Sequence, residues 1–349
     1  MTGFPRGAQA ASALVLLLAA CGEPAQPAAQ PSTPPAVAPA AAGPRPITLA
    51  LPIACQVGRD CFVQSYFDRD PGPANRDYRC GAQTYPDHDG LDIRLTSLAA
   101  QRRGVAVLAA APGVVRGVRD GVADVSIRET GREAVANREC GNGVAIVHAD
   151  GWETQYCHMA QGSIRVRTGE TVQAGTPLGR VGLSGMTEFP HVHLAVRRNG
   201  EEVDPFAYGA APGACGGGVS LFAPEAQAAL AYREGAVINL GLAGGPVTEA
   251  QIDAEATTPP SRTTPLVVFA RAINLQAGDV QTLTITGPDG RPLHSRALAP
   301  LDRAKASWFA FSGDRPGAGG WPAGRYTARY EVRRGGRVVL QEAAAASVP

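Results

Sequence analysis

The sequence predicts an all-β protein built from two β domains. Glycine and proline are frequent, at 42 and 29 of 349 residues, and long helical patterns are few. Short apolar runs alternate with tight-turn signals, and Asp150-Gly151 and Asn199-Gly200 each join two such runs as in a β-hairpin. The chain has room for two ordinary domains, and its formal charge of +1 gives no support for a nucleic-acid partner.

The first domain is predicted over residues 47–212 as a small antiparallel sheet with tight corners. It begins with the apolar run 47–53, and residues 104–118 divide into two strands at Pro112-Gly113. The later segments are a hairpin over 141–159, a stretch with regularly spaced glycines over 168–185, and a second hairpin over 191–205.

The second domain is predicted over residues 213–349 as an immunoglobulin-like β-sandwich. The glycine run 213–220 marks the boundary, because glycine runs are flexible, and residues 224–231 are expected to form a short helix. The remaining segments have the pattern of sandwich strands, and every second residue of 326–332 is apolar.

The N-terminus has the features of an exported lipoprotein precursor. Residues 1–20 are expected to form a signal peptide, because their apolar run is too short to span a bilayer permanently. The run ends in Leu-Ala-Ala before Cys21, which resembles a bacterial lipobox and makes Cys21 the expected lipidation site. An ordinary cleaved signal with a chance cysteine is the alternative. Gly22 follows the cysteine, and by the same resemblance it favours the outer membrane.

Residues 21–46 are expected to form an extended tether. They consist almost only of Pro, Ala, Gln, Gly, Ser and Thr, a composition that buries no apolar core. The tether would hold the folded domains away from the membrane that anchors them.

Six of the seven cysteines remain after Cys21, and an even number in an exported chain suggests up to three disulfides. Cys55 and Cys61 are close enough in sequence to close a small loop and are the favoured pair. The other four allow three pairings: Cys80, Cys140, Cys157 and Cys215. A cysteine zinc cluster is the rival interpretation, but the chain has no CxxC spacing to support it.

The strand-like run 191–198 begins with two histidines one residue apart. Side chains in a strand alternate between faces, so His191 and His193 share one face and the apolar Val192 and Leu194 share the other. A polar outer face is the simplest explanation of such a pair taken alone. A metal site would need further ligands from elsewhere in the chain.

Further ligands are found upstream, in a loop that enters a strand. His88 and Asp92 are four residues apart, and together with one more imidazole they complete the three-ligand set of a catalytic zinc. His158 lies at the end of the predicted hairpin over 141–159 and is a fourth candidate histidine. Asp87 and Asp89 flank His88 and are expected to be solvated, with a hydrogen bond to a ligand imidazole as the alternative.

Three motifs in this order carry a resemblance to a known family. The chain has His-Asp-Gly-Leu-Asp at 88–92, Tyr-Cys-His-Met at 156–159 and His-Val-His-Leu at 191–194, with the glycine-rich stretch 175–185 between the last two. This pattern resembles the lysostaphin/LytM-type zinc metallopeptidases, which cut peptidoglycan cross-links. The resemblance implies a small antiparallel β fold with its site in a groove across the sheet.

The resemblance also implies the roles of the site residues. One Zn2+ per chain would be bound by His88, Asp92 and His193, and His158 and His191 would be the catalytic pair. The sequence has no HExxH motif to supply a glutamate base. One of the catalytic pair would therefore take the proton of a water, or donate a hydrogen bond to the oxyanion, and the sequence does not divide these roles.

The expected function is that of a zinc endopeptidase that cleaves peptide cross-links of peptidoglycan. Its expected location is the cell envelope, anchored by lipid and facing the periplasm, with peptidoglycan, the membrane and an envelope protein at the C-terminal domain as partners. One alternative is a catalytically silent family member that binds or activates other murein hydrolases. A cupin or non-haem iron site is a further alternative, but the first glutamate after the histidine pair is Glu201, beyond a turn. The last alternative is a binding protein whose zinc site is vestigial.

Overall fold

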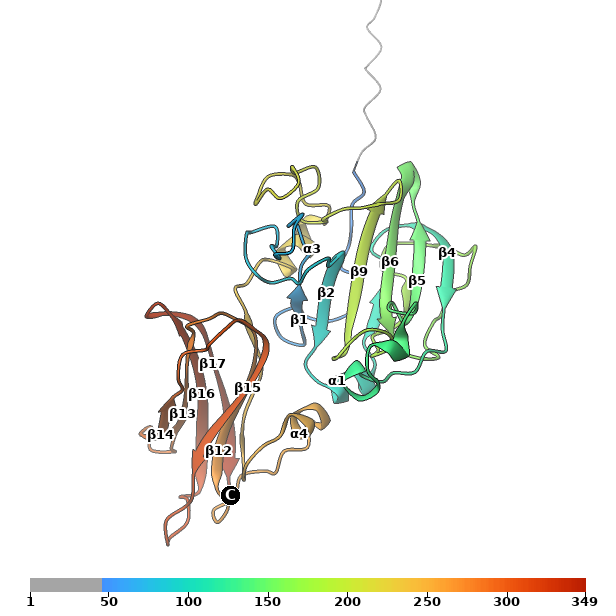
Figure 1. Cartoon of the computed structure of the whole chain (residues 1–349). Helices are drawn as coiled ribbons and strands as arrows, with labels where there is room; N and C mark the ends of the chain where they lie inside the picture. The colour runs from blue at the N-terminus through green and yellow to red at the C-terminus, as the bar shows by residue number, and fades with distance from the viewer. Residues whose placement is uncertain (1–45) are drawn as a thin grey trace, which may run out of the picture. The chain divides into compact units, whose positions relative to one another are not determined.

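The computed structural model describes residues 46–349, which form mostly antiparallel β-sheet with a few short helices (Figure 1). The predicted signal peptide, Cys21 and nearly all of the predicted tether lie outside the described residues. Among the described residues, no helix combines the length and the apolar character needed to cross a membrane.

An eight-stranded antiparallel sheet forms the first part of the described chain, and β9 lies in it between β2 and β6 (Figure 1). The order across the sheet is β1-β2-β9-β6-β5-β4-β7, and β10 pairs with the free end of β9. The bounds are β1 Cys61–Ser65, β2 Gly90–Leu95, β4 Gly113–Arg119, β5 Asn142–Val147, β6 Trp152–Met159, β7 Thr171–Val172, β9 His191–Arg198 and β10 Glu201–Glu202. A separate pair consists of β3 Ala106–Leu108 and β8 Pro177–Arg180.

Both predicted hairpins are confirmed. Asp150 and Gly151 join β5 to β6, and Asn199 and Gly200 join β9 to β10. All four turn residues have positive φ, which glycine and asparagine adopt at low cost and which matches the twist of the flanking strands. The two turns therefore set the register of β5 with β6 and of β9 with β10.

The apolar run over residues 47–53, which begins the predicted first domain, does not form a regular strand. Leu49 and Ile53 are fully buried but form only isolated bridges, to Phe222 and Val107. Pro52 lies between them and has no N–H to donate to a ladder. The segment therefore contributes its side chains to the core without joining the main sheet.

Four short α-helices lie outside the sheets of residues 46–349: α1 Leu98–Arg103, α2 Ile127–Thr130, α3 Pro224–Ala229 and α4 Glu249–Ala254. Two 3₁₀ turns lie at Glu133–Val135 and Ala149–Gly151. The predicted helix near residue 224 is confirmed as α3. The sequence reasoning did not identify α4, although Thr248 and Gln251 form a capping box at its start, which is a recognisable helix signal.

Three disulfides join the six remaining cysteines. The favoured pair Cys55–Cys61 is confirmed, and the other bonds are Cys80–Cys215 and Cys140–Cys157. The last bond ties the segment before β5 to β6. The rival interpretation of a cysteine zinc cluster is therefore wrong.

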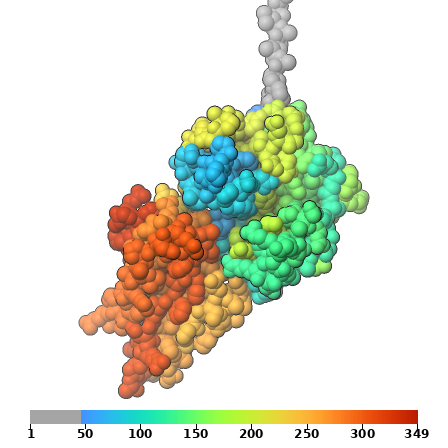
Figure 2. Space-filling view, in the orientation of Figure 1, coloured from blue at the N-terminus to red at the C-terminus, as the bar shows by residue number. Residues whose placement is uncertain are grey.

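Strands β11–β17 form two sheets that pack together, and they gather into one lobe, orange to red in Figure 2. The orders are β11-β12-β15 and β14-β13-β16-β17. The bounds are β11 Ala236–Ala243, β12 Leu266–Leu275, β13 Val280–Thr286, β14 Pro292–Ala297, β15 Lys305–Asp314, β16 Gly324–Arg334 and β17 Arg337–Val348. The predicted alternation in β16 is confirmed, since Tyr326, Ala328, Tyr330 and Val332 are all almost fully buried between the sheets.

One feature of the sandwich favours an immunoglobulin-like topology and one departs from it. Tyr326, near the start of the sixth strand, donates a hydrogen bond of 2.7 Å to the carbonyl of Pro322, as in a tyrosine corner. In constant-type immunoglobulin domains, however, the fourth strand belongs to the sheet of the first, second and fifth strands. Here β14 pairs with β13 instead. The two-sheet sandwich is present, and its immunoglobulin-like class stays a prediction.

The predicted boundary at residues 212/213 also stays a prediction, and the packing favours a later one. Cys215 is bonded to Cys80. Leu221 and Leu230 are buried in the core beneath the first sheet, and the carbonyl of Leu221 accepts a hydrogen bond from Leu49. Residues up to about 230 therefore pack with the first sheet.

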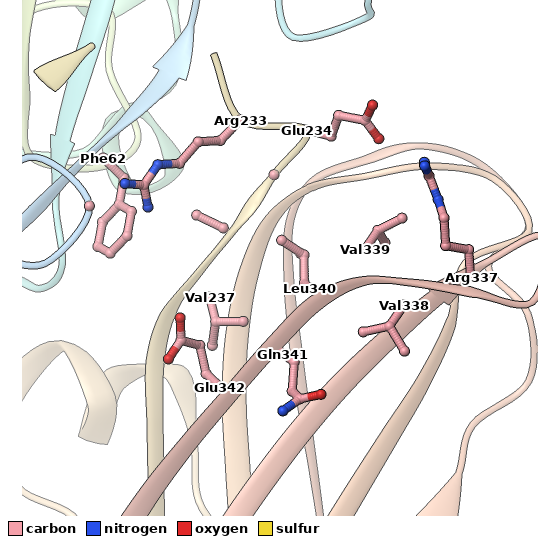
Figure 3. A pocket seen from close by; sticks show the side chains of 13 residues that line it. Phe62, Arg233, Glu234, Val237, Arg337, Val338, Val339, Leu340, Gln341 and Glu342 are labelled. Atoms are coloured by element: carbon pink, nitrogen blue, oxygen red, sulfur yellow. The ribbon is translucent and has the colours of Figure 1, made fainter. Parts of the chain in front are cut away.

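Side chains of the first sheet and of the sandwich are in direct contact. Gln64 and Asn274 exchange two hydrogen bonds, of 3.2 Å between their side chains and 2.9 Å to the carbonyl of Gln64. A cavity of about 410 Å³ lies beside this contact, and Figure 3 shows Phe62 and Arg233 at its wall with residues of β11 and β17.

Candidate metal centre and active site

The adjacent strands β2 and β9 carry most of the candidate residues on one face. Asp92 is the register partner of His193, and Arg94 is the register partner of His191. The opposite face of both strands is apolar, and Leu91, Ile93, Val192 and Leu194 have no exposed surface. Burial of that face fixes the orientation of the strands, so the histidines and Asp92 are held together on the other face.

Three side chains meet in a geometry suited to a metal ion. The Oδ1 atom of Asp92 lies 3.2 Å from Nε2 of His88 and 2.9 Å from Nδ1 of His193, and the two nitrogen atoms are 3.2 Å apart. Two ligand atoms at tetrahedral positions around zinc are about 3.4 Å apart, given Zn–N and Zn–O distances near 2.1 Å. The residues therefore fit zinc without rearrangement of the backbone, and they are the candidate metal cluster among the described residues.

Each of the two imidazoles uses its other nitrogen in a hydrogen bond. Nδ1 of His88 donates to the carbonyl of Tyr66 at 2.6 Å, and Nε2 of His193 donates to Oδ1 of Asp89 at 3.1 Å. In the neutral rings the proton is held there, and the lone pairs of His88 Nε2 and His193 Nδ1 point to the shared space. The surroundings thus select the tautomers that a cation needs.

Asp89 is not simply a solvated loop carboxylate, which was the expectation from sequence. It contacts His193, and its second oxygen lies 3.6 Å from Arg197. Asp87, on the other side of His88, is exposed as expected.

His158 and His191 lie beside this cluster, with ring centroids 4.5 Å apart. Nδ1 of His158 donates to the carbonyl of Ser184 at 2.8 Å, and Nδ1 of His191 lies 3.0 Å from both the carbonyl of Phe189 and the hydroxyl of Thr187. Nε2 of each ring is then free to accept a proton or, when protonated, to donate. Nε2 of His191 lies 3.4 Å from Oδ1 of Asp92, so this pair borders the metal cluster directly.

Burial and mutual charge determine the protonation of the cluster. Burial opposes ionisation of Asp92, but the charges of His88 and His191 outweigh it and hold the pKa of the carboxyl well below its usual range. Burial also opposes protonation of His193, but the hydrogen bonds that it donates to Asp89 and Asp92 outweigh it and raise the pKa of His193 to about 10. Burial, reinforced by the neighbouring histidines, lowers the pKa of His158 well below its ordinary value, so His158 is neutral at pH 7.

A comparison with known families identifies the type of domain that contains this geometry. Residues 86–205, which include the five candidate residues, match the family model described as Peptidase family M23. The chain contains an M23 peptidase domain. The predicted resemblance to lysostaphin/LytM-type peptidases is therefore confirmed for this part of the chain.

Relatives of the M23 domain match over short segments. "DD-carboxypeptidase/endopeptidase Mpg" from Neisseria meningitidis is 40% identical over 70 residues, which are 19% of this chain and 14% of the relative. The catalytic domain of the prophage-encoded M23 protein EnpA from Enterococcus faecalis is 27% identical, with a TM-score of 0.31 over 43% of this chain and 92% of that one. The catalytic domain of lysostaphin from Staphylococcus simulans is 21% identical, with a TM-score of 0.26 over 40% and 85%.

A groove of about 330 Å³ opens on the face of the M23 domain that carries the cluster. Its wall includes His158 and His193, and around them lie Tyr85, Asp89, Glu139, Gln155, Met186 and Arg197. Tyr85 is 49% exposed, and its ring centroid lies 4.3 Å from that of His88. The groove gives an extended polar substrate access to the buried histidines.

The Cys140–Cys157 disulfide fixes the backbone at His158. Cys157 immediately precedes His158 and is the register partner of His193. His158 has a positive φ of 59°, unusual for a residue with a side chain, and its N–H donates to the carbonyl of Cys140 at 2.8 Å. The disulfide and this hydrogen bond hold a backbone conformation that costs on the order of 1–3 kcal/mol.

Sequence reasoning missed the residues that orient the imidazoles. The Tyr66 carbonyl and the Ser184 carbonyl carry no sequence signal, because any residue supplies a carbonyl. Thr187 is four residues before His191, and Asp89 is adjacent to His88. Only Asp89 had been considered for such a contact. His148 is not part of the site, and its two nitrogens bond to Pro112 and Thr154.

Proposed function

We propose that the chain is a zinc-dependent endopeptidase that cleaves the peptide cross-links of peptidoglycan. The observation that carries the proposal is the meeting of three ligand atoms of His88, Asp92 and His193 within 3.2 Å of one another, with two more buried histidines beside them. The family of the domain and the name of the meningococcal relative, a DD-carboxypeptidase/endopeptidase, support peptidase activity.

Bound zinc would supply a Lewis acid that lowers the pKa of water and polarises a carbonyl. The residues of the chain supply the proton transfer and the hydrogen bonds of the reaction. His158 and His191 each hold a proton on Nδ1 through a backbone carbonyl, which leaves Nε2 to face the reaction. One of them accepts the proton of the attacking water at Nε2, and the other, when it is protonated on both nitrogens, donates a hydrogen bond from Nε2 to the oxygen that gains charge.

The test is cleavage of cross-linked muropeptides by the purified chain, with zinc content measured on the same samples. His158→Ala and His191→Ala are expected to keep the zinc and to lower turnover by about 10²- to 10³-fold, because the three ligands remain. His148→Ala is the matched control, since its nitrogens bond away from the site. Zinc binding by the wild type without any cleavage would favour the catalytically silent alternative. Normal cleavage by both variants would refute the mechanism.

We further propose that the protein acts in the cell envelope, anchored through a lipid on Cys21 and held at the outer membrane, with residues 21–46 as a tether. The lipobox-like sequence before Cys21 and the three disulfides of the described residues support export. The expected cross-link is the D-alanyl–diaminopimelate bridge.

A further inference from the structure

A second cavity, separate from the groove, adjoins the other side of the candidate active site. It has a volume of about 480 Å³ and lies where β2, the segment before β9, α4 and the sandwich meet. Its lining includes Arg94, Phe189, Glu249, Arg271 and Ser307. The mechanism proposed above does not use it.

Two buried arginines form part of the lining, and each is only 3% exposed. The guanidinium of Arg271 is neutralised, because it lies 2.9 Å from Asp253 and also donates to Asn239 and to the carbonyl of Thr96. Arg94 instead donates to the neutral Gln64 side chain at 2.7 Å and to the carbonyl of Leu95 at 3.5 Å.

Among residues 46–349, Arg94 therefore has a buried positive charge without a salt bridge, and the carboxylates of Asp253 and Glu249 act on it only from a distance. The carboxylates at the cavity other than Asp253 are on its exposed rim. Glu129 and Glu249 are exposed, and Glu188 pairs with the exposed Arg128 at 2.8 Å. A buried charge is poorly screened, and the planar guanidinium matches the two oxygens of a carboxylate.

The cavity is close enough to the catalytic histidines for one substrate to occupy both. The guanidinium carbon of Arg94 lies 4.2 Å from the centroid of the Phe189 ring, and that ring lies 4.9 Å from the ring of His191. The charge is thus within about 9 Å of His191, the length of two to three residues of extended peptide. Phe189 lies at the boundary of the cavity and contacts both Arg94 and His191.

We propose that this cavity binds a free carboxylate of the substrate peptide, carried two to three residues from the bond that is cut, with Arg94 as its main partner. The inference rests on the proposed function, because it takes the ligand to be a peptidoglycan peptide. It makes Arg94 a specificity-determining residue: the chain prefers stem peptides whose carboxylates are free over those in which they are amidated.

The test measures binding rather than turnover. The probes are the stem tetrapeptide L-Ala-D-Glu-diaminopimelate-D-Ala and the same peptide with its carboxylates amidated, titrated calorimetrically into the chelator-treated full chain. The wild type is expected to bind the free acid at least about tenfold more tightly than the amide, and Arg94→Gln to bind the two within about twofold. Arg116→Gln is the control, since its side chain is exposed, pairs with Glu153 and lies outside the cavity.

A second variant keeps the test decisive if Arg94→Gln does not fold. Ser307 is an exposed residue on the rim, and Ser307→Glu places a carboxylate there without disturbing a buried contact. It is expected to weaken binding of the free acid and to leave the amide unchanged. Equal binding of both peptides by the wild type overturns the inference, as does an equal loss for both peptides in either variant. Absence of cross-link cleavage by the zinc-loaded chain would count separately, against the proposed function.

Discussion

Asp89 offers a sharp test of how the metal cluster is held. Its carboxylate accepts the proton of His193 Nε2 at 3.1 Å, so that Nδ1 keeps its lone pair for zinc. Loss of such a partner typically weakens metal affinity about 10- to 100-fold. The Asp89 side chain is 35% exposed, so solvent screens part of its charge. We therefore expect Asp89→Asn, which keeps an acceptor oxygen, to weaken zinc binding by about tenfold.

Asp89→Ala removes the acceptor as well as the charge, and its effect should approach about 100-fold. Competition with a chelator of known affinity measures both values. Asp87→Asn is the matched control, because Asp87 lies in the same loop on the other side of His88 and is exposed. Asp92→Ala removes a direct ligand and should abolish the binding of one zinc ion per chain. Wild-type affinity in Asp89→Ala, or an equal loss in Asp87→Asn, would refute the reasoning.

Three further predictions concern pH, stability and anchoring. Zinc affinity should rise about tenfold per pH unit from about pH 7 to 9, because the proton of His193, whose pKa is about 10, must leave before zinc binds; a flat profile in chelator competition would contradict this. Removal of the Cys80–Cys215 bond, which spans 135 residues, by a double alanine variant should lower the free energy of unfolding by about 3–5 kcal/mol. Urea unfolding measures it, and an unchanged midpoint would argue against the bond. Cys21→Ala should lack the lipid mass and leave the membrane fraction, and a covalent lipid found elsewhere would defeat the assignment of Cys21.

Much of the site could be predicted from local patterns in the sequence. The period-two alternation in residues 191–196 placed both histidines on one face, and the structure has the intervening valine and leucine residues fully buried. The turns at Asp150-Gly151 and Asn199-Gly200 were also readable, because few residues adopt positive φ. These are short-range properties, since each depends on neighbours within a few residues.

Contacts between distant segments could not be predicted from the sequence. The apolar run over residues 47–53 forms only isolated bridges, because Pro52 interrupts its ladder. The pairing of Cys80 with Cys215 and of Cys140 with Cys157 was one of three possibilities, and only the folded chain selects it. The glycine run 213–220 suggested a domain boundary. Leu221 and Leu230 nevertheless pack beneath the first sheet, which favours a boundary after them.

The sequence by itself determined which residue types were available for a metal site, their order, and the faces of the strands that carry them. The tertiary structure alone decided which nitrogen of each imidazole is free, because the partners that hold the other nitrogen come from distant segments: Tyr66 for His88, Asp89 for His193 and Ser184 for His158. It also decided that Arg94 is buried without a salt bridge among the described residues. Both follow from how strands far apart in sequence pair, which no local pattern specifies.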